Sequence, residues 1–190
     1  RQRQMCIRDS SKAFETFGHL LTENNRLIFF ATRLQGLAVA PNNPKKIYSI
    51  LDIASRKARF INRREGTGTR ILFDQILDVL AVKPEEIEGY NDISDTQFFT
   101  AVQIAAGKVD VGLCTANVAK ENGLEFIPLA KEVYYLAADQ KFLETQKAKK
   151  FLQFLRSYDW SEHKEQLEGY DFNGTGEVFK VSDVFPSEGN

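Results

Sequence analysis

The residues best suited to chemistry in this sequence form a small turn flanked by arginines. The turn spans residues 66–69 with the sequence Gly-Thr-Gly-Thr, and Arg63, Arg64 and Arg70 flank it. An apolar stretch precedes the turn and a helical pattern follows it, so the turn opens a helix. A helix N-terminus has unpaired N–H groups and a partial positive charge, which favour an oxyanion or a carboxylate. We therefore expect an anion cradle built from Arg64, Gly66, Thr67, Gly68, Thr69 and Arg70.

Two other interpretations of this turn have to be weighed. It lacks the glycine-to-lysine spacing of a P-loop and the third glycine of a dinucleotide fingerprint, so the sequence disfavours a nucleotide site. The turn could also be purely structural, with glycine supplying unusual backbone angles and threonine capping the helix. Arg63 and Arg64 could equally be solvated or paired with Glu65.

Further ligand contacts are expected where other elements begin or end. Ser94 and Gln97 have the spacing of a capping box for a helix at residues 95–106, and that helix start could present a hydroxyl to the same ligand. A second hydroxyl follows the strand at residues 109–113, where an α/β sheet places its ligands. Each of these features could instead be only a cap or edge packing. The three candidate residues outside the turn are Thr96, Thr115 and Tyr134.

The sequence holds little that suggests catalysis. His19 and His163 stand alone on expected helices, without a Ser-His-Asp order or a metal-binding spacing. Cys114 has no nearby histidine, so we expect a small buried hydrophobic residue and not a nucleophile. We therefore expect no catalytic residue, no metal site and no cofactor.

Composition narrows the class of protein. The chain has 190 residues, of which 43% are hydrophobic, enough for one ordinary globular unit or two small lobes. Its formal net charge of −1 makes direct nucleic-acid binding by this segment an unfavoured role. No apolar run reaches the roughly 18 to 20 residues of a membrane span. Two distant cysteines fit a reducing compartment, so we expect a cytoplasmic protein, with a periplasmic one as the alternative.

Hydrophobic periodicity predicts alternating strands and helices, which is typical of an α/β sheet with crossover connections. A short helix should start at Pro84, where proline occupies its favoured first position. We expect strands at residues 27–32, 36–40, 58–62, 109–113, 124–129 and 132–138, and longer helices at 11–23, 50–55, 69–80, 95–106, 115–122, 144–157 and 159–169.

The two ends of the chain differ from the rest. Residues 1–10 match no recognisable element and are similar to translated adapter sequence, so we expect a non-native leader there. Residues 181–190, with a proline and a glycine near the end, should form a flexible tail.

Several segments together carry a family resemblance. In order and spacing, roughly residues 26–178 resemble the periplasmic-binding-protein-like domain (type II) found behind helix-turn-helix regulators and molybdopterin-biosynthesis enzymes, and related to molybdate-binding proteins. The most specific element is the strand followed by Gly-Thr-Gly-Thr-Arg. The segments that carry the resemblance are residues 34–41, 60–70, 101–113, 169–171 and 175–177.

That resemblance implies a two-lobed α/β fold with the ligand in a cleft between the lobes. Residues 11–58 and 130–180 would form lobe I, and residues 59–129 would form lobe II. The family's first strand and helix should precede residue 11, so the resemblance implies a fold truncated at its N-terminus.

The resemblance also implies a function. We expect a sensing domain that binds a small anion, with molybdate, tungstate or a similar oxyanion ranked before a small organic anion, and that regulates an attached domain. The partners it implies are an upstream helix-turn-helix domain and a second copy in a homodimer. The alternatives are the C-terminal domain of a molybdenum-cofactor biosynthesis enzyme and the solute-binding receptor of an anion transporter.

Overall fold

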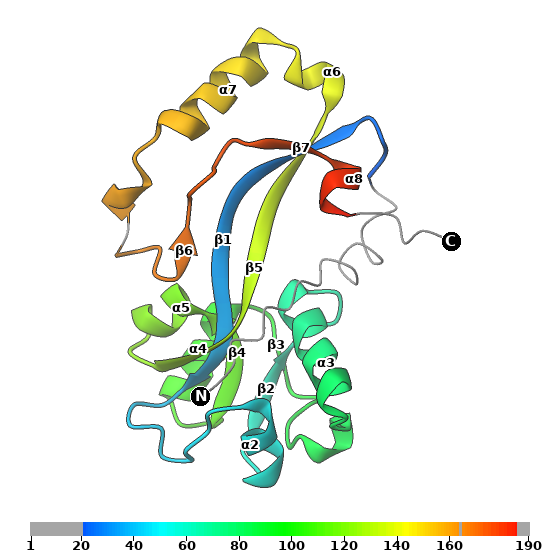
Figure 1. Cartoon of the computed structure of the whole chain (residues 1–190). Coiled ribbons are helices and arrows are strands. Elements are labelled where there is room, and N and C mark those ends of the chain that lie inside the picture. Colours follow the sequence, from blue (N-terminus) through cyan, green and yellow to red (C-terminus); the bar gives the residue numbers. More distant parts are fainter. Residues whose placement is uncertain (1–20, 164, 186–190) are drawn as a thin grey trace. The chain divides into compact units, whose positions relative to one another are not determined.

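The computed structural model describes residues 21–163 and 165–185. The expected leader at residues 1–10 and most of the expected helix at 11–23 lie outside these residues. The described chain forms two compact units, each with a mixture of strands and helices (Figure 1). Unit 1 contains residues 34–131 and 166–169, and unit 2 contains residues 21–33, 132–163, 165 and 170–185.

Unit 1 is built on a sheet whose strand order is β3-β2-β4-β1-β5. β2 runs parallel to both β3 and β4, whereas β1 runs antiparallel to β4 and places Gln35 opposite Thr115. The carboxyl ends of the three parallel strands therefore lie along one edge of the sheet. The strands are β1 (Asn25–Val39), β2 (Phe60–Arg63), β3 (Ile93–Ser94), β4 (Val111–Thr115) and β5 (Glu125–Asp139).

Each parallel strand of unit 1 is followed by a helix that begins near that edge. The expected helix at 50–55 is confirmed, and the helix after the Gly-Thr-Gly-Thr turn begins one residue earlier than expected. The predicted start at Pro84 is a single 3-10 turn. The helical elements of unit 1 are α2 (Ile50–Ser55), α3 (Gly68–Leu80), the 3-10 helix η2 (Pro84–Glu86), α4 (Gln97–Ala105) and α5 (Ala116–Glu121).

α3 is held on the sheet by its apolar face. Leu72, Phe73, Ile76 and Leu77 recur at helical spacing and are buried. Phe73 stacks on Phe60 of β2, with ring centroids 4.3 Å apart. This packing fixes the start of α3 relative to the end of β2, where the candidate cradle lies.

Two pairs of expected strands are in fact single long strands. Residues 27–32 and 36–40 belong to β1, and residues 124–129 and 132–138 belong to β5. In β1 the five residues at the carboxyl end are all buried, whereas the first part mixes buried and half-buried positions. The burial pattern changes because the strand continues from unit 2 into unit 1. From the sequence alone, this change looks like the end of one strand and the start of another.

Unit 2 contains the first part of β1 and the last part of β5, together with the shorter elements near the end of the chain. β6 and β7 both pair antiparallel with β1. A cluster of aromatic rings, Phe30, Trp160 and Phe172, packs within this unit. The elements are α6 (Gln140–Leu143), α7 (Gln146–Ser157), the 3-10 helix η3 (Trp160–His163), β6 (Tyr170–Asp171), β7 (Val178–Lys180) and α8 (Val181–Val184).

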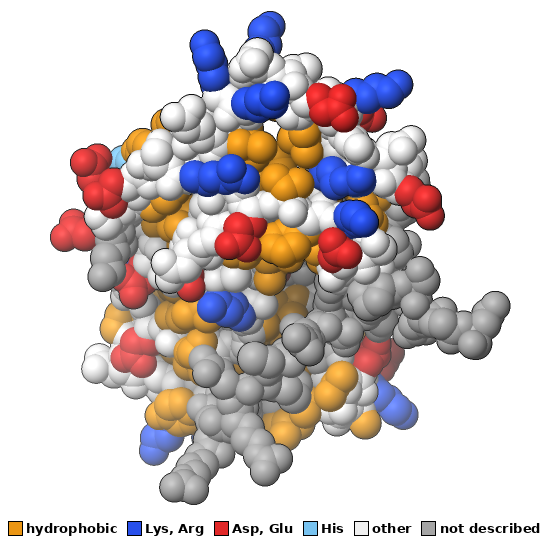
Figure 2. Space-filling model, turned by 45° about the horizontal axis from the view of Figure 1, so that its top comes forward, with side chains coloured by type: hydrophobic (Ala, Val, Ile, Leu, Met, Phe, Trp, Pro, Cys, Tyr) orange, Lys and Arg blue, Asp and Glu red, His pale blue; other side chains and the backbone are white. Residues whose placement is uncertain are grey.

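Three expectations for the last part of the chain differ from the structure. The helix expected at 144–157 is α7, which begins two residues later, and α6 before it was not expected. Among the described residues, the helix expected at 159–169 is only the turn η3. The expected flexible tail contains α8, capped by the side chain of Asp183. Figure 2 looks toward the α6–α7 end and shows hydrophobic side chains exposed among lysines and arginines.

The boundaries between the two units lie at other positions than the lobe boundaries expected from the sequence. The expected boundaries were at residues 58/59 and 129/130. The units change over between Arg33 and Leu34 and between Lys131 and Glu132. Residues 34–58, which the sequence assigned to lobe I, therefore pack within unit 1.

Candidate functional site

The candidate cradle lies at the carboxyl edge of β2 in unit 1. Gly66 has a φ of +78°, a left-handed conformation that favours glycine, as the structural interpretation of the turn required. Thr67 caps α3: its Oγ1 donates to the Arg64 carbonyl at 2.8 Å and accepts from the Arg70 N–H at 3.4 Å. The Thr67 hydroxyl is thus committed to the turn. Within the described chain, the next two backbone N–H groups, those of Gly68 and Thr69, have no hydrogen-bond partner.

Thr69 is the centre of a buried polar network. Its side chain is only 4% exposed, and its Oγ1 accepts hydrogen bonds from Gln97 Nε2 at 2.9 Å and from Gln35 Nε2 at 3.2 Å. A hydroxyl offers two acceptor lone pairs and one donor hydrogen. With the Gln35 amide nitrogen facing Thr69, both lone pairs of Thr69 are occupied, and its hydrogen has no assigned acceptor among the described residues. A buried donor in this state calls for an acceptor from outside the chain.

The geometry around Gln97 fixes the direction of the bond between Gln97 and Thr69. Gln97 Oε1 accepts from the backbone N–H of Thr115 at 3.0 Å and from Thr115 Oγ1 at 3.0 Å. Because a backbone N–H can only donate, the amide oxygen must face Thr115 and the amide nitrogen must face Thr69. Gln97 thus joins α3, α4 and the end of β4 through one side chain.

Gln35 and Gln97 were not among the site residues expected from the sequence. Gln35 begins the fully buried carboxyl part of β1, before residues 36–39, and is itself fully buried. A buried glutamine between apolar residues is unusual, because an amide pays a desolvation penalty unless it is hydrogen-bonded. That pattern was the available signal for Gln35, whereas Gln97 was interpreted only as a helix cap.

The capping box expected for α4 is not formed. The N-cap of α4 is Thr96, whose Oγ1 accepts from the Phe99 N–H at 3.0 Å. Ser94 instead donates its hydroxyl hydrogen to the Thr96 carbonyl at 2.9 Å. The helix therefore begins two residues later than expected, and this shift frees the Gln97 side chain to reach Thr69 and Thr115.

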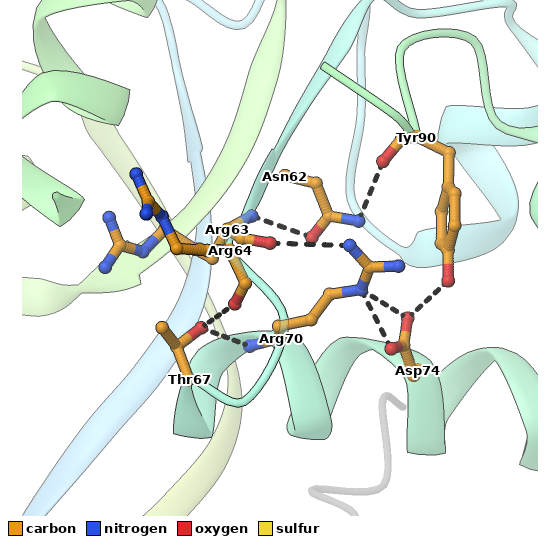
Figure 3. A network of polar contacts seen from close by, with 7 residues as sticks. All are labelled: Asn62, Arg63, Arg64, Thr67, Arg70, Asp74 and Tyr90. Atoms are coloured by element: carbon orange, nitrogen blue, oxygen red, sulfur yellow. Dashed lines mark hydrogen bonds and ion pairs between the residues drawn. The ribbon is translucent and has the colours of Figure 1, made fainter. Parts of the chain in front are cut away.

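Arg70 turns away from this network and forms a separate one (Figure 3). Its Nε donates to both carboxylate oxygens of Asp74, at 2.8 and 3.0 Å, and its guanidinium lies 4.3 Å above the ring of Tyr90. The Tyr90 hydroxyl donates to the same carboxylate at 2.9 Å. Burial alone would lower the pKa of Arg70, but the bonds to Asp74 and Tyr90 outweigh it and raise that pKa. The charge of Arg70 is therefore compensated within the protein.

The other two arginines lie on the side away from Tyr90 (Figure 3). Arg64 forms an exposed ion pair with Asp95. Arg63 donates from Nη1 to the Ser94 carbonyl at 3.1 Å, and its buried Nε has no hydrogen-bond partner. Burial lowers the pKa of Arg63; the charge of Asp95 opposes this effect, and the charge of Arg64 adds to it. Of the three arginines, Arg63 has the least compensated charge, although the expected site residues included Arg64 and not Arg63.

The remaining candidates lie in different places. Thr115 joins the Thr69 network, whereas Tyr134 belongs to unit 2, where the guanidinium of Arg33 lies 4.3 Å above its ring. Cys114 is fully buried, and burial raises the pKa of its thiol to about 12. The expectation that Cys114 is a buried hydrophobic residue is confirmed. That the expected residues bind a ligand stays a prediction.

Other kinds of site are not visible in the described part of the chain. Its histidine, cysteine and acidic side chains form no group of three or more that could hold a metal ion. The helices described here include none that is long and apolar enough to cross a membrane.

Comparison with known proteins agrees with the fold. A relative, the uncharacterized protein YvgK of Bacillus subtilis (strain 168), is 35% identical over 152 residues, which are 80% of this chain and 49% of YvgK. The chain thus spans about half the length of that relative.

Solved structures of low identity share the architecture. The substrate-binding domain of a molybdenum ABC transporter from Clostridium difficile aligns with a TM-score of 0.52 and 14% identity, covering 85% of this chain and 73% of that one. L-phospholactate-bound PEB3 aligns with a TM-score of 0.54 and 15% identity, covering 76% of this chain and 67% of that one. These likenesses show the two-lobed α/β fold of periplasmic binding proteins.

The family follows from a direct match to the sequence. The model of the PBP superfamily domain matches residues 9–156, which include β1 to β5 and the whole Thr69 network. The chain therefore belongs to the PBP superfamily and is a substrate-binding, periplasmic-binding-protein-like domain.

Proposed function

We propose that this domain binds a small anion at the carboxyl edge of β2, β3 and β4 in unit 1. The observation that carries the proposal is the buried Thr69 hydroxyl, which accepts two hydrogen bonds and has its hydrogen left to donate. The free N–H groups of Gly68 and Thr69 lie at the same helix start. Donors without an acceptor, at a helix N-terminus, favour a ligand that offers oxygen atoms and negative charge.

The charges around this edge support a small anion of low charge. Arg70 is paired with Asp74, and Arg64 is paired with Asp95, so each pair adds no net charge. Arg63 remains as the cation whose charge is least compensated. A site of hydroxyl, amide and backbone donors with one such cation suits a tetrahedral oxyanion, such as molybdate or tungstate. The molybdenum-transporter neighbour supports this ranking.

A small organic anion is the second candidate ligand. A carboxylate would accept the same hydrogen bonds and could form a forked pair with the Arg63 guanidinium. The PEB3 neighbour with L-phospholactate shows that this fold also accommodates an organic anion. The two candidates differ in shape, so a panel of ligands separates them.

The test is calorimetric titration of the full chain with molybdate, tungstate, sulfate, phosphate and small carboxylates. Thr69→Ala should weaken binding of the ligand that gives heat by roughly 10- to 100-fold, the effect of losing a hydrogen bond to a charged group. Thr69→Ser retains the hydroxyl and should recover most of the affinity.

Thr145→Ala is the control, since it removes a threonine hydroxyl in unit 2, where Thr145 caps α7. It should lower stability but leave the affinity unchanged. Absence of heat with every anion would refute the proposal, and equal weakening by Thr69→Ala and Thr145→Ala would show that the site was placed wrongly.

We also propose that ligand binding regulates an attached domain, such as a helix-turn-helix domain of a transcriptional regulator. The support is the relative YvgK, of which this chain matches only about half. A ligand that favours one state of this domain would shift the partner domain by its difference in affinity for the two states.

The sequence of the complete gene tests this attachment. A helix-turn-helix segment would support regulation, whereas a long enzymatic region would favour a molybdenum-cofactor biosynthesis enzyme. A signal peptide would favour the receptor of a transporter, and either of these two results would overturn regulation.

A further inference from the structure

Gln97 occupies a position where a carboxylate would be the more stabilising side chain. It is the first residue of α4, and the positive end of a helix favours negative charge. Its side-chain oxygen accepts from the backbone N–H and from the hydroxyl of Thr115, at 3.0 Å each, and a carboxylate would accept the same two bonds more strongly. Gln97 is only half-buried, so a charge there would remain in contact with water. The stability of this helix start therefore does not explain the amide.

The amide nitrogen of Gln97 makes a bond that a carboxylate cannot make. Nε2 donates to Thr69 Oγ1 at 2.9 Å and so occupies a lone pair of that hydroxyl. A carboxylate has only acceptors, and a hydroxyl that faces it must donate its own hydrogen. The choice between amide and carboxylate at position 97 thus decides whether the Thr69 hydrogen points away from residue 97 or toward it.

The hydrogen bonds through Gln97 all run in one direction. Thr115 donates to the Gln97 oxygen, and the Gln97 nitrogen donates to Thr69. With the Gln35 nitrogen on the other lone pair, the Thr69 hydroxyl is left with its hydrogen to donate. Bonds in such a chain polarise one another, so each strengthens the donor that follows. The chain of bonds begins at the end of β4, crosses the start of α4 and delivers a donor at the start of α3.

We propose that Gln97 sets the polarity of the candidate site, so that its amide commits this edge of unit 1 to ligands that accept hydrogen bonds. The proposal rests on the anion binding proposed above. Gln97 is a positioning residue, because it acts through the Thr69 hydroxyl. A carboxylate in its place would turn that hydroxyl inward, present a lone pair to the ligand and add a negative charge. Stability and anion affinity should then respond differently to the same substitution.

The test is Gln97→Glu, a change of nearly equal size. Calorimetry on the full chain measures the affinity for molybdate or, if the wild type gives no heat with molybdate, for the tightest binder among tungstate, sulfate, phosphate and lactate. The affinity should fall by roughly 100-fold, because one donor is withdrawn and a like charge is added. The urea midpoint should not fall, because the carboxylate keeps the bonds from Thr115 and favours the helix start. Loss of affinity and stability together would indicate a purely structural role and overturn the proposal.

Gln103→Glu is the matched control, since it makes the same change six residues later on the same helix. The added charge lies about 9 Å further along α4. The affinity should stay within about twofold of the wild type, because water and salt screen a charge at that distance. An equal loss in both variants would mean that added charge alone weakens binding, and would overturn the role of Gln97.

A double-variant cycle separates action through Thr69 from a direct effect of charge. If Gln97→Glu already withdraws the Thr69 hydrogen, adding Thr69→Ala should change the affinity by less than about threefold. Independent effects would instead add the roughly 10- to 100-fold loss expected for Thr69→Ala alone, and that result would also overturn the proposal.

The outcomes also separate this proposal from the function on which it rests. No heat from the wild type with any anion would refute anion binding, and the role of Gln97 with it. A wild type that binds, together with a Gln97→Glu variant that binds equally well, would overturn only the role assigned to Gln97.

Discussion

Thr69 and Arg70 are neighbours in the first turn of α3, but only the side chain of Arg70 has its bonding capacity fully used within the protein. Arg70 is buried with its charge paired to Asp74 and its face against Tyr90. Thr69 is buried and accepts from two amide nitrogens, which leaves its hydroxyl hydrogen to donate. Both are polar and both were expected in the cradle. Only one of them has bonding capacity left for a ligand.

The difference shows that a residue type near a helix start does not by itself define a ligand contact. An arginine four residues before an aspartate on a helix can satisfy itself locally. A threonine hydroxyl has only one hydrogen, so two incoming amide donors leave that hydrogen unused. Counting donors and acceptors therefore separates Arg70, which has a structural role, from Thr69, which can bind a ligand.

The largest effect on stability should come from removing Arg70, which has a structural role in the turn. Arg70→Ala removes a buried cation from Asp74 and Tyr90, which should cost about 2 kcal/mol of unfolding free energy, because the Asp74 carboxylate that remains is 39% exposed and is screened by water. Urea denaturation followed by circular dichroism measures this loss.

Arg56→Ala is the matched control, because Arg56 forms the same helical spacing of ion pair with Asp52 but is 42% exposed. Its cost should be only about 0.5 kcal/mol. If the two variants lost equal amounts of unfolding free energy, the burial of Arg70 would not contribute to the strength of its ion pair.

A smaller effect should distinguish the two threonines of the turn. Thr67→Ala removes the cap of α3 and should cost about 1 kcal/mol of stability. It should reduce anion affinity less than Thr69→Ala does, because the Thr67 hydroxyl already bonds within the turn. Thermal unfolding with and without ligand measures both quantities, and a greater loss of affinity in Thr67→Ala would reverse the assignment.

The smallest effect should appear at alkaline pH. Burial raises the pKa of Tyr90, and the hydrogen bond to Asp74 raises it further. A raised pKa in the folded state contributes stability that is complete below the unfolded value of about 10 and is lost as pH rises through the folded value. Wild-type stability should therefore decline more steeply above pH of about 10 than that of Tyr90→Phe. Urea midpoints measured across this range would show parallel curves if Tyr90 were not involved.

Much of the fold was predictable because its signals are local. Helix α3 has a strong apolar period, and Gly66 has the left-handed backbone that the turn required. The two long strands were not predicted as single elements, because β1 and β5 each pass between two units with different surroundings.

The site was predicted only in part, because its key contacts join residues far apart in sequence. Thr69 and Thr115 were expected from their positions at element ends. Gln35 was missed because its role appears only when β1 pairs with β4. The role of Gln97 depends on α4 starting after Thr96, a difference of two residues that a capping pattern does not resolve.

The antiparallel pairing of β1 with β4 also determines when the site can form. Gln35 leaves the ribosome before Thr69, Gln97 and Thr115, yet it is held opposite Thr115 in the finished sheet. Closing such a long loop costs chain entropy before any contact offsets it, so contacts of this kind form slowly. During synthesis, the strand that carries Gln35 must wait until β4 has emerged. Ligand-binding competence should thus be acquired late and in a single step, when β1 docks on β4.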